Sequence, residues 1–406
     1  MKKAVIYGAC NIGRGFIGQL LTMSGYEVAF MDINKEVIGK LNEDRQYPIT
    51  IVSNDGNREI IVKNVYGIDS SVEENAIKAI FEADIMSTSL GVNVLRFVAK
   101  TLAKAIEMRI DAKRPPLNIL LCENLIDANI YLKNEIFKYL SDDKKAVFDE
   151  NIGLVEASIG RMVPVLPKKE GDNILRVAVE EFDVLHLDRD GFVGELPEIY
   201  NTRLCSPFNL YIQRKLFIHN MCHCVCAHLG ANDYEYISEA IEDVDIKYIV
   251  EQVGVTSARA IAMENGGDVG ELIDFLNKLL YRFYNKELKD TIARVGKDPI
   301  RKLKKIDRLT GAYLLAKKHG IDTTFNMIAF AAALCFRKDG DDASYAVNDD
   351  YKALGVVETL KKYTEVEFSE EEGKIIEGYC KLIEAGDLKT AIKTAERLRA
   401  KSIPNK

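Results

Sequence analysis

Short apolar runs alternate with amphipathic stretches along the first 125 residues. Residues 4–7, 27–32, 84–87 and 117–122 are apolar runs of the length and composition typical of buried strands. Between them, apolar residues recur at helical spacing over residues 12–21, 74–82 and 92–108. Strands that alternate with helices predict an α/β fold with a mainly parallel, doubly wound sheet.

The rest of the chain divides into an irregular part and a helical part. Residues 49–68 predict a hairpin around the turn Asn54-Asp55-Gly56-Asn57, residues 154–165 and 174–184 predict strands, and residues 191–207 predict a loop. From residue 210 onward the periodicity is helical. The predicted helices cover residues 210–229, 237–263, 271–283, 307–318, 324–335, 351–363 and 370–400. We therefore predict a sheet domain over residues 1–205 and a mainly α-helical domain over residues 206–406.

Composition narrows the class of protein. The chain has 406 residues, enough for two or three domains, and a net charge of −7, which argues against a nucleic-acid binder held by bulk electrostatics. Eight cysteines are too few for a disulfide scaffold of this size. The longest apolar run, residues 327–336, is far shorter than a membrane span. We expect a cytoplasmic protein that binds neither membranes nor nucleic acid.

The segment from Gly8 to Gly13 follows the first strand and opens the first helix. Glycines at these two positions permit a tight turn and close helix–sheet packing, and a helix N-terminus favours a pyrophosphate. Asp32 ends the second strand, where a carboxylate accepts hydrogen bonds from an adenosine ribose and repels a 2′-phosphate. This pattern predicts a Rossmann-type domain that binds NAD rather than NADP.

Cys10 departs from the dinucleotide fingerprint, because a glycine normally stands where the backbone approaches the pyrophosphate. The alternative interpretation is a plain strand–turn–helix without a ligand. The candidate cofactor-binding residues are Gly8, Ala9, Cys10, Asn11, Ile12, Gly13, Arg14 and Asp32.

Residues 215–230 combine an apolar helical face with a polar one. At about 100° per residue, Lys215, His219, Asn220 and His223 fall within about 140° of one another, opposite the apolar arc. An amine, an amide and imidazoles suit proton abstraction and carbonyl polarisation. A solvated helix face is the alternative.

A metal site is a further alternative for this segment. His219 and His223 stand four residues apart, as do Cys222 and Cys226, so each pair could chelate an ion from one helix face. No paired Cys or His cluster elsewhere in the sequence completes a tetrahedral site. We therefore predict no metal.

Residues 294–308 hold seven basic and two acidic side chains in an otherwise acidic protein. Such a segment suits a phosphate pocket. Without further information, the residue pattern favours a solvated basic helix start over a phosphate pocket.

Together these residues resemble the polyol-specific long-chain dehydrogenases, over most of the chain. The resemblance rests on Gly8 to Gly18, on Cys122-Glu123-Asn124, and on residues 156–164, where Gly160 replaces an acidic residue. Its most specific element is the spacing of Lys215, Asn220 and His223. Residues 294–303 and 307–309 resemble the branch of the family that acts on sugar phosphates.

The resemblance implies interconversion of mannitol 1-phosphate and fructose 6-phosphate with NAD and without a metal. It implies that Lys215 is the general base, that Asn220 and Asn124 donate hydrogen bonds to the reacting oxygen, and that His223 orients and polarises it. Arg301 and Lys302 are the candidate phosphate ligands. A uronate reductase, a free-polyol dehydrogenase and a non-catalytic NAD-binding regulator remain alternatives.

Overall fold

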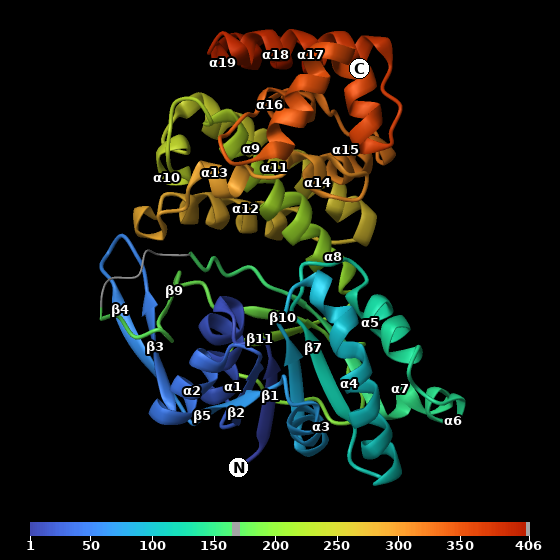
Figure 1. Ribbon diagram of the computed structural model, residues 1–406. Helices are drawn as coiled ribbons and strands as arrows, with labels where there is room; N and C mark the ends of the chain where they lie inside the picture. The colour runs from blue at the N-terminus through green and yellow to red at the C-terminus, as the bar shows by residue number, and fades with distance from the viewer. Residues whose placement is uncertain (165–170, 403–406) are drawn as a thin grey trace. The chain divides into compact units, whose positions relative to one another are not determined.

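The apolar strands of the first half of the chain pair into one main sheet in the computed structural model, which describes residues 1–164 and 171–402 (Figure 1). The strand order is β11-β10-β8-β7-β6-β1-β2-β5. The six strands from β8 to β5 run parallel, whereas β10 runs antiparallel to β8. The strands are β1 Lys3–Tyr7, β2 Glu27–Asp32, β5 Val65–Asp69, β6 Ile85–Thr88, β7 Leu117–Leu121, β8 Ile152–Ser158, β10 Leu185–Asp188 and β11 Thr202–Cys205.

Apolar side chains cover both faces of this sheet, as a doubly wound fold requires. Ala4 and Ile6 of β1 pack in one core with residues of η1 and α1, while Val5 and Tyr7 pack in a second core with α3, α4 and α5. The predicted fold class is therefore confirmed. The helices of this part are η1 Gly13–Gly18, α1 Gln19–Met23, α2 Lys35–Asp44, α3 Glu73–Glu82, α4 Val92–Asp111, α5 Ala128–Phe137, α6 Asp142–Ala146 and α7 Phe148–Asn151.

A small second sheet accounts for part of the irregular region. β3 (Gln46–Ile51) and β4 (Arg58–Lys63) form an antiparallel hairpin, and β9 (Val177–Val179) adds to β3 in parallel. The hairpin prediction was correct for these strands but wrong beyond residue 64, because β5 pairs with β2 at the edge of the main sheet. The predicted strand 154–165 was correct only up to Ser158, where β8 ends; residues 159–164 are not in a strand, and residue 165 lies outside the described residues.

The prediction of a loop over residues 191–207 was also wrong at its end. β11 lies there, paired with β10 at the other edge of the main sheet. Its Arg203 and Leu204 are exposed, so the strand lacks the buried apolar pattern that a sequence search detects.

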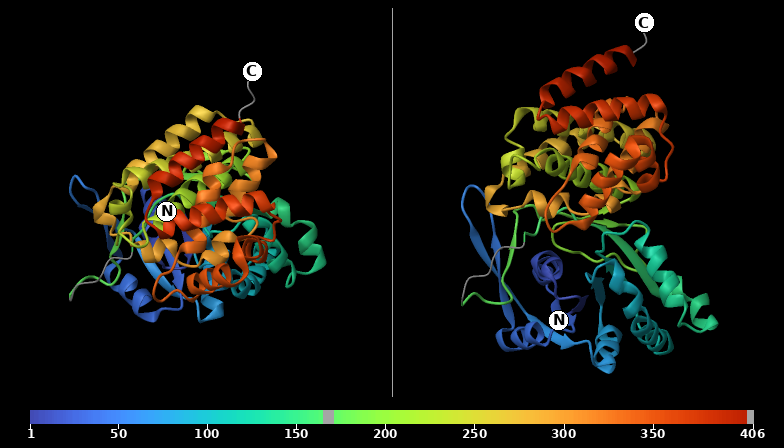
Figure 2. Two further views of the ribbon diagram at one scale, coloured as in Figure 1. Left: turned by 90° about the horizontal axis from the view of Figure 1, so that it is seen from above. Right: turned by 45° about the horizontal axis from the view of Figure 1, so that its top comes forward.

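The second half of the chain is mostly helical (Figure 2). The contacts divide the chain after Tyr211, inside α8, rather than after residue 205. The helices are α8 Asn209–Gln213, η2 Arg214–Asn220, α9 Met221–Leu229, α10 Ile237–Ala240, α11 Val244–Asn265, α12 Val269–Phe283, η3 Lys286–Leu288, α13 Ile292–Gly296, α14 Pro299–Leu303, α15 Arg308–Lys318, α16 Thr324–Cys335, α17 Asp342–Thr364, α18 Glu370–Glu384 and α19 Leu388–Ser402. Gly355 interrupts α17 with a φ of 78°.

Helix α9 lies in the core of the helical part, packed against α11, α13 and α16. Its Cys222, Cys224 and Cys226 are completely buried, because most of the helix surface is covered. These thiols behave as small apolar side chains in this core.

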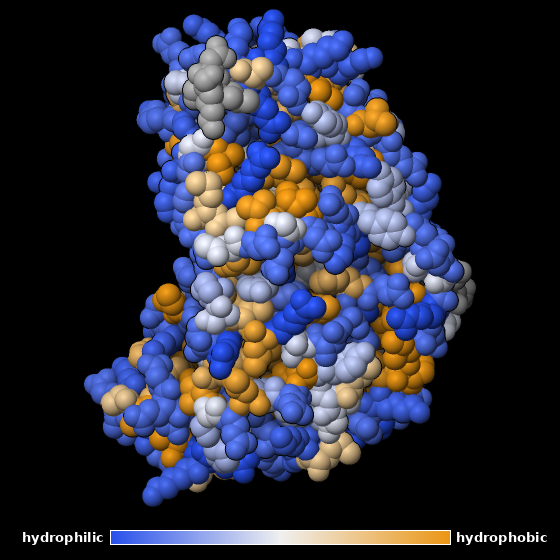
Figure 3. All heavy atoms as spheres, turned by 180° about the vertical axis from the view of Figure 1, so that it is seen from behind, coloured by the Kyte–Doolittle hydropathy of each residue, from blue (hydrophilic) through white to orange (hydrophobic). Residues whose placement is uncertain are grey.

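Polar residues cover much of the face in Figure 3, with apolar residues scattered among them. Within residues 1–164 and 171–402, none of the helices combines the length and the apolar character needed to cross a bilayer.

Candidate active site

The turn after β1 requires its two glycines. Gly8 has a φ of +108°, and a Cβ there would lie 2.5 Å from the carbonyl oxygen of Ser89. A Cβ on Gly13 would lie 2.3 Å from the carbonyl oxygen of Gly8. Both distances are far below van der Waals contact, so only glycine fits at these two positions.

Cys10 caps the helix that begins at Asn11. Its Sγ accepts a weak hydrogen bond from Gly13 N at 3.5 Å and donates one to the carbonyl oxygen of Ser89 at 3.0 Å. A serine or threonine commonly fills this N-cap role, and a thiol is a weaker substitute. The departure from the fingerprint is thus accommodated locally, by a thiol that contacts the end of β6.

Asp32 lies next to this turn. Its Oδ2 accepts a hydrogen bond from Ala9 N at 2.8 Å, and its Oδ1 accepts one from Asn34 N at 3.0 Å. Each carboxylate oxygen can accept a further hydrogen bond. The structure therefore brings together Asp32 and the predicted cofactor turn.

The environment of the Arg14 side chain differs from that expected of a cofactor-binding residue. Its side chain is buried, and Nη1 reaches the carbonyl oxygen of Ile174 at 3.4 Å. Burial lowers the pKa of the guanidinium from its usual value. Its backbone oxygen accepts a hydrogen bond from Tyr47 at 2.7 Å, so Arg14 ties the first helix to neighbouring segments.

Two buried carboxyl groups hold the loop that carries the exposed Asn124. Glu123 accepts hydrogen bonds from Thr88 Oγ1 at 2.6 Å and from Leu90 N at 3.0 Å, and burial raises its pKa. Glu156 accepts one from Ala128 N at 3.0 Å, and burial raises its pKa to about 7. Glu123 precedes Asn124 directly in the sequence, but no spacing related Glu156 to this loop.

A π-helix, η2, carries Lys215 and Asn220. The sequence prediction assumed an α-helix, in which residues five apart point about 140° away from each other. A π-helix closes its hydrogen bonds between residues five apart, at about 4.4 residues per turn, so such residues lie almost one above the other. The π-helix therefore brings Lys215 and Asn220 closer to one face than an α-helix would.

The prediction that His219 lies on a polar helix face beside Lys215 was wrong. The side chain of His219 is only 6% exposed, so it is buried rather than solvated. Burial, together with nearby cations such as Arg282 and Lys215, keeps its pKa well below the usual value, so the imidazole is neutral at pH 7.

His223 contacts a carboxylate that the sequence did not point to. Its Nε2 lies 3.0 Å from Oδ2 of Asp290, and its ring stacks on Phe283 with centroids 4.8 Å apart. Asp290 is 67 residues further along the chain. No spacing in the sequence relates residues that only tertiary folding brings together.

The two predicted phosphate ligands lie on α14 but differ in environment. Arg301 is partly exposed and pairs with Asp298 at 3.3 Å and Asp307 at 3.5 Å. Lys302 is 2% exposed, and burial, reinforced by Arg301 and Arg308, lowers its pKa to about 8. Within the described residues, the Lys302 ammonium makes no hydrogen bond or ion pair.

The cysteines and histidines of α9 and η2 do not converge. Cys222 Sγ donates to the carbonyl oxygen of Val250 at 3.6 Å, and the rings of His219 and His223 lie 6.1 Å apart. In the part of the chain that the structure describes, no group of three or more His, Cys, Asp or Glu residues could hold a metal ion.

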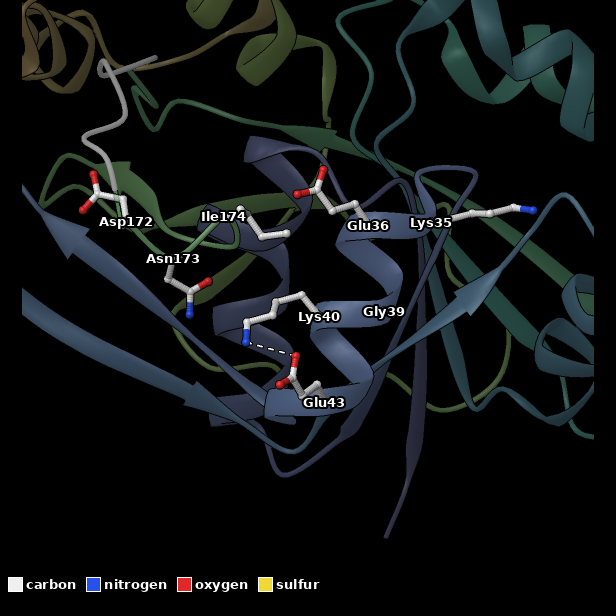
Figure 4. A pocket seen from close by; sticks show the side chains of 9 residues that line it. Lys35, Glu36, Gly39, Lys40, Glu43, Asp172, Asn173 and Ile174 are labelled. Carbon is white, nitrogen blue, oxygen red and sulfur yellow. Dashed lines mark hydrogen bonds and ion pairs between the residues drawn. The ribbon is translucent and has the colours of Figure 1, made fainter.

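A surface pocket of about 600 Å³ lies between α2 and residues 171–174 (Figure 4). Its side chains carry both signs of charge, and Lys40 already pairs with Glu43 at 3.1 Å and Asp44 at 3.0 Å. None of the predicted site residues lines it. The pocket therefore adds nothing to the candidate site.

Two family models match this chain. The family described as "Mannitol dehydrogenase Rossmann domain" matches residues 2–201, and "Mannitol dehydrogenase C-terminal domain" matches residues 208–380. The mannitol-1-phosphate 5-dehydrogenase of Thermoanaerobacter pseudethanolicus is 36% identical over 368 residues, which cover 90% of this chain and 94% of the relative.

Two solved structures share the fold. A substrate-free D-sorbitol dehydrogenase aligns with a TM-score of 0.79 at 16% identity, over 96% of this chain and 95% of the other. The mannitol 2-dehydrogenase of Pseudomonas fluorescens, in a ternary complex with NAD and D-mannitol, aligns with a TM-score of 0.75 at 15% identity, over 98% and 94%. The family matches span most of the chain, and this protein therefore belongs to the mannitol dehydrogenase family of oxidoreductases.

Proposed function

We propose that the protein interconverts D-mannitol 1-phosphate and D-fructose 6-phosphate with NAD. The observation that supports a phosphorylated substrate is the environment of Lys302, which is a buried cation without an anionic partner among the described residues. A buried charge is costly unless it is paired, so an ammonium in this position suits an anionic ligand. The 36% identical relative, named a mannitol-1-phosphate 5-dehydrogenase, supports the same substrate.

The residues of the first turn fit NAD. Gly8 and Gly13 permit the tight turn after β1, and the helix that follows this turn presents its N-terminus to a pyrophosphate. Asp32 stands where it accepts hydrogen bonds from a ribose and disfavours a 2′-phosphate. When bound, NAD supplies the hydride acceptor for the oxidation of the alcohol.

Lys215 is the general base in this proposal. It removes the proton from the substrate hydroxyl as the alcohol carbon is oxidised, and it returns a proton in the reverse direction. Asn220 donates a hydrogen bond to the same oxygen, and Asn124 is assigned the same role. His223 orients and polarises that oxygen. These groups stabilise alkoxide character without a metal ligand.

Arg301 and Lys302 bind the substrate phosphate in this proposal. Arg301 offers a guanidinium that is already oriented by Asp298 and Asp307. Lys302 supplies a point charge in a buried environment, where an electrostatic contact is stronger than in water.

A substrate panel tests the proposal. We expect reduction of fructose 6-phosphate with NADH to exceed reduction of fructose and of fructuronate by at least about 100-fold in kcat/KM, since two charged contacts, of Arg301 and Lys302, would each contribute about 1.5–3 kcal/mol. NADPH in place of NADH should reduce the rate. Equal turnover of the unphosphorylated sugars would overturn the phosphate assignment. NADH binding without reduction of any of these compounds would indicate a regulator instead.

A further inference from the structure

Each carboxylate oxygen of Asp290 makes a close contact with a neighbouring side chain. Oδ2 lies 3.0 Å from Nε2 of His223, and Oδ1 accepts a hydrogen bond from Nε of Arg294 at 2.8 Å. The side chain of Asp290 is 7% exposed, whereas that of Arg294 is 53% exposed. The carboxylate is thus enclosed on the side of His223 and covered by Arg294 on the other.

The backbone holds Asp290 firmly in this position. Its carbonyl oxygen accepts a hydrogen bond from Ile237 N at 2.9 Å. The next residue, Thr291, forms an isolated bridge with Tyr236. A carboxylate on such a restrained backbone has little freedom to follow His223, so it can fix the imidazole rather than adapt to it.

The imidazole is restrained from a second direction. Phe283, at the end of α12, is 2% exposed, and its ring stacks on that of His223 at an interplanar angle of 23°. Within residues 1–164 and 171–402, no hydrogen bond involves Nδ1 of His223. One ring nitrogen faces the carboxylate, one ring face is covered, and Nδ1 is left for another partner.

Asp290 is ionised in this environment. Burial alone would raise its pKa, but His223 and Arg294 together hold that pKa below the usual value. The contact to Nε2 is an ion-pair distance rather than a well-aligned hydrogen bond. Such contacts commonly align fully only when substrate is bound.

We propose that Asp290 is a positioning residue that acts through His223: its carboxylate accepts a hydrogen bond from Nε2 and fixes the ring so that Nδ1 contacts the reacting oxygen of the substrate. This inference rests on the role of His223 in the proposed function. The two ring nitrogens are distinct, and a fixed carboxylate beside one of them sets the orientation of the imidazole. Loss of that contact misplaces the group that orients the substrate.

A double-mutant cycle tests this coupling. We expect Asp290→Asn to lower kcat about 10- to 100-fold with little change in the KM for NADH, since small misplacements of orienting groups cost about this much. In a His223→Ala background, the same Asp290→Asn change should have almost no further effect on kcat. A full additional loss in that background would overturn the proposal, because Asp290 would then act by another route.

The control variant is Glu372→Gln, which removes another hydrogen-bonded, partly buried carboxylate from the helical part. It should lower the melting temperature without lowering kcat. Asp290→Asn keeps the shape of the side chain, so this variant should still fold. Melting temperatures of all variants identify losses that come from instability.

A spectroscopic readout separates this inference from the proposed function. In ¹⁵N spectra of histidine-labelled protein, the His223 signals, assigned by their absence in His223→Ala, should show an Nε2 that carries a proton hydrogen-bonded to Asp290. This Nε2 signal should shift in Asp290→Asn. An unchanged Nε2 signal would overturn the positioning role. Because this measurement needs no turnover, it succeeds or fails independently of the substrate panel.

Discussion

At the scale of single residues, the proposed chemistry depends on cations and bases that are only partly solvated. Lys302 is almost completely buried, while Lys215, Asn220 and His223 have intermediate exposure. Charges in such places interact more strongly with a ligand than surface charges do, because less water screens them. Single substitutions at these residues should therefore have large and separable effects on KM and kcat.

Lys215→Ala should remove the general base. We expect kcat to fall about 10²- to 10⁴-fold, while the Kd for NADH, measured by fluorescence titration, changes little. The physical reason is that the amine acts on the substrate proton and has no assigned contact with the cofactor. A rate near that of the unaltered protein would show that another group takes this proton.

Lys302→Met should raise the KM for fructose 6-phosphate about 10- to 100-fold at pH 7, since a charge-assisted contact contributes about 1.5–3 kcal/mol. The KM for free fructose should not change. The pKa of Lys302 is lowered to about 8, so the ammonium is charged below that pH and neutral above it.

The effect of Lys302→Met on the KM for fructose 6-phosphate should therefore depend on pH. The ratio of the KM of Lys302→Met to that of the unaltered protein should be largest below pH 8 and should shrink towards pH 9.5, where both proteins lack the charge. Initial rates at several pH values with both sugars measure this ratio. A ratio that is constant from pH 7 to pH 9.5 would contradict the assignment of Lys302 to the phosphate.

At the scale of helices and strands, local hydrogen bonds decide where elements begin. Ser369 and Glu372 form a capping box at the start of α18, and Glu372 also accepts hydrogen bonds from Tyr313 and from Lys317 at 2.9 Å. Burial opposes ionisation of Glu372, but these donors lower its pKa to about 2. One carboxylate thus connects the start of α18 to α15.

Glu372→Gln should therefore destabilise the helical part in a pH-dependent way. The folded pKa lies below the unfolded value, so the ionised carboxylate stabilises the fold above about pH 4.5, and this contribution is lost as pH falls towards 2. The difference in unfolding free energy between the two proteins should be greatest near pH 7 and should decrease below pH 4.5. Urea unfolding at pH 7 and pH 3 measures it. An equal difference at both pH values would contradict the role of the charge.

The sequence predicted most elements, because burial of one helix face or of both strand faces leaves a periodic apolar pattern. It did not predict β11, whose Arg203 and Leu204 are exposed at an edge. The sequence did not predict the π-helix η2 either. A π-helical turn changes the directions in which Lys215 and Asn220 point, but it does not require different residue types.

The same distinction between local and tertiary features applies to the residues of the candidate site. The glycine turn, Asp32 and the spacing of Lys215, Asn220 and His223 are local in sequence and could be identified there. Asp290 could not, because its contact with His223 forms only when α9 and α13 pack together. Burial of His219 also depends on the packing around η2, which a single-helix projection does not include.

At the scale of the whole molecule, net charge and ligand charge are unrelated. The chain carries a net charge of −7, yet the proposed substrate is an anion. Arg301, Lys302 and Arg308 gather positive charge within a few residues of one another, and the field near a ligand is set by such near groups, because salt screens distant ones over about 8–10 Å. A total charge therefore excludes only ligands bound by the bulk field of the protein.

The boundary between the two units of the chain can be tested with fragments. The sequence places the boundary after residue 205, whereas the contacts divide the chain after Tyr211. Phe208 is 6% exposed, Tyr211 stacks on His186 with ring centroids 5.1 Å apart, and the Tyr211 carbonyl oxygen accepts a hydrogen bond from Ser158 at 3.2 Å. Residues 206–211 thus pack on the first unit.

A fragment of residues 1–211 should consequently be more stable than one of residues 1–205. Burial of one large aromatic side chain stabilises by about 2 kcal/mol, which corresponds to about 4–8 °C in the Tm of a domain of this size. Both fragments should bind NADH through the turn after β1, and neither should turn over, because Lys215 is absent from both. Calorimetry and NADH titration of the two fragments measure these effects. Equal Tm values would place Phe208 and Tyr211 with the helical unit and would support the boundary after residue 205.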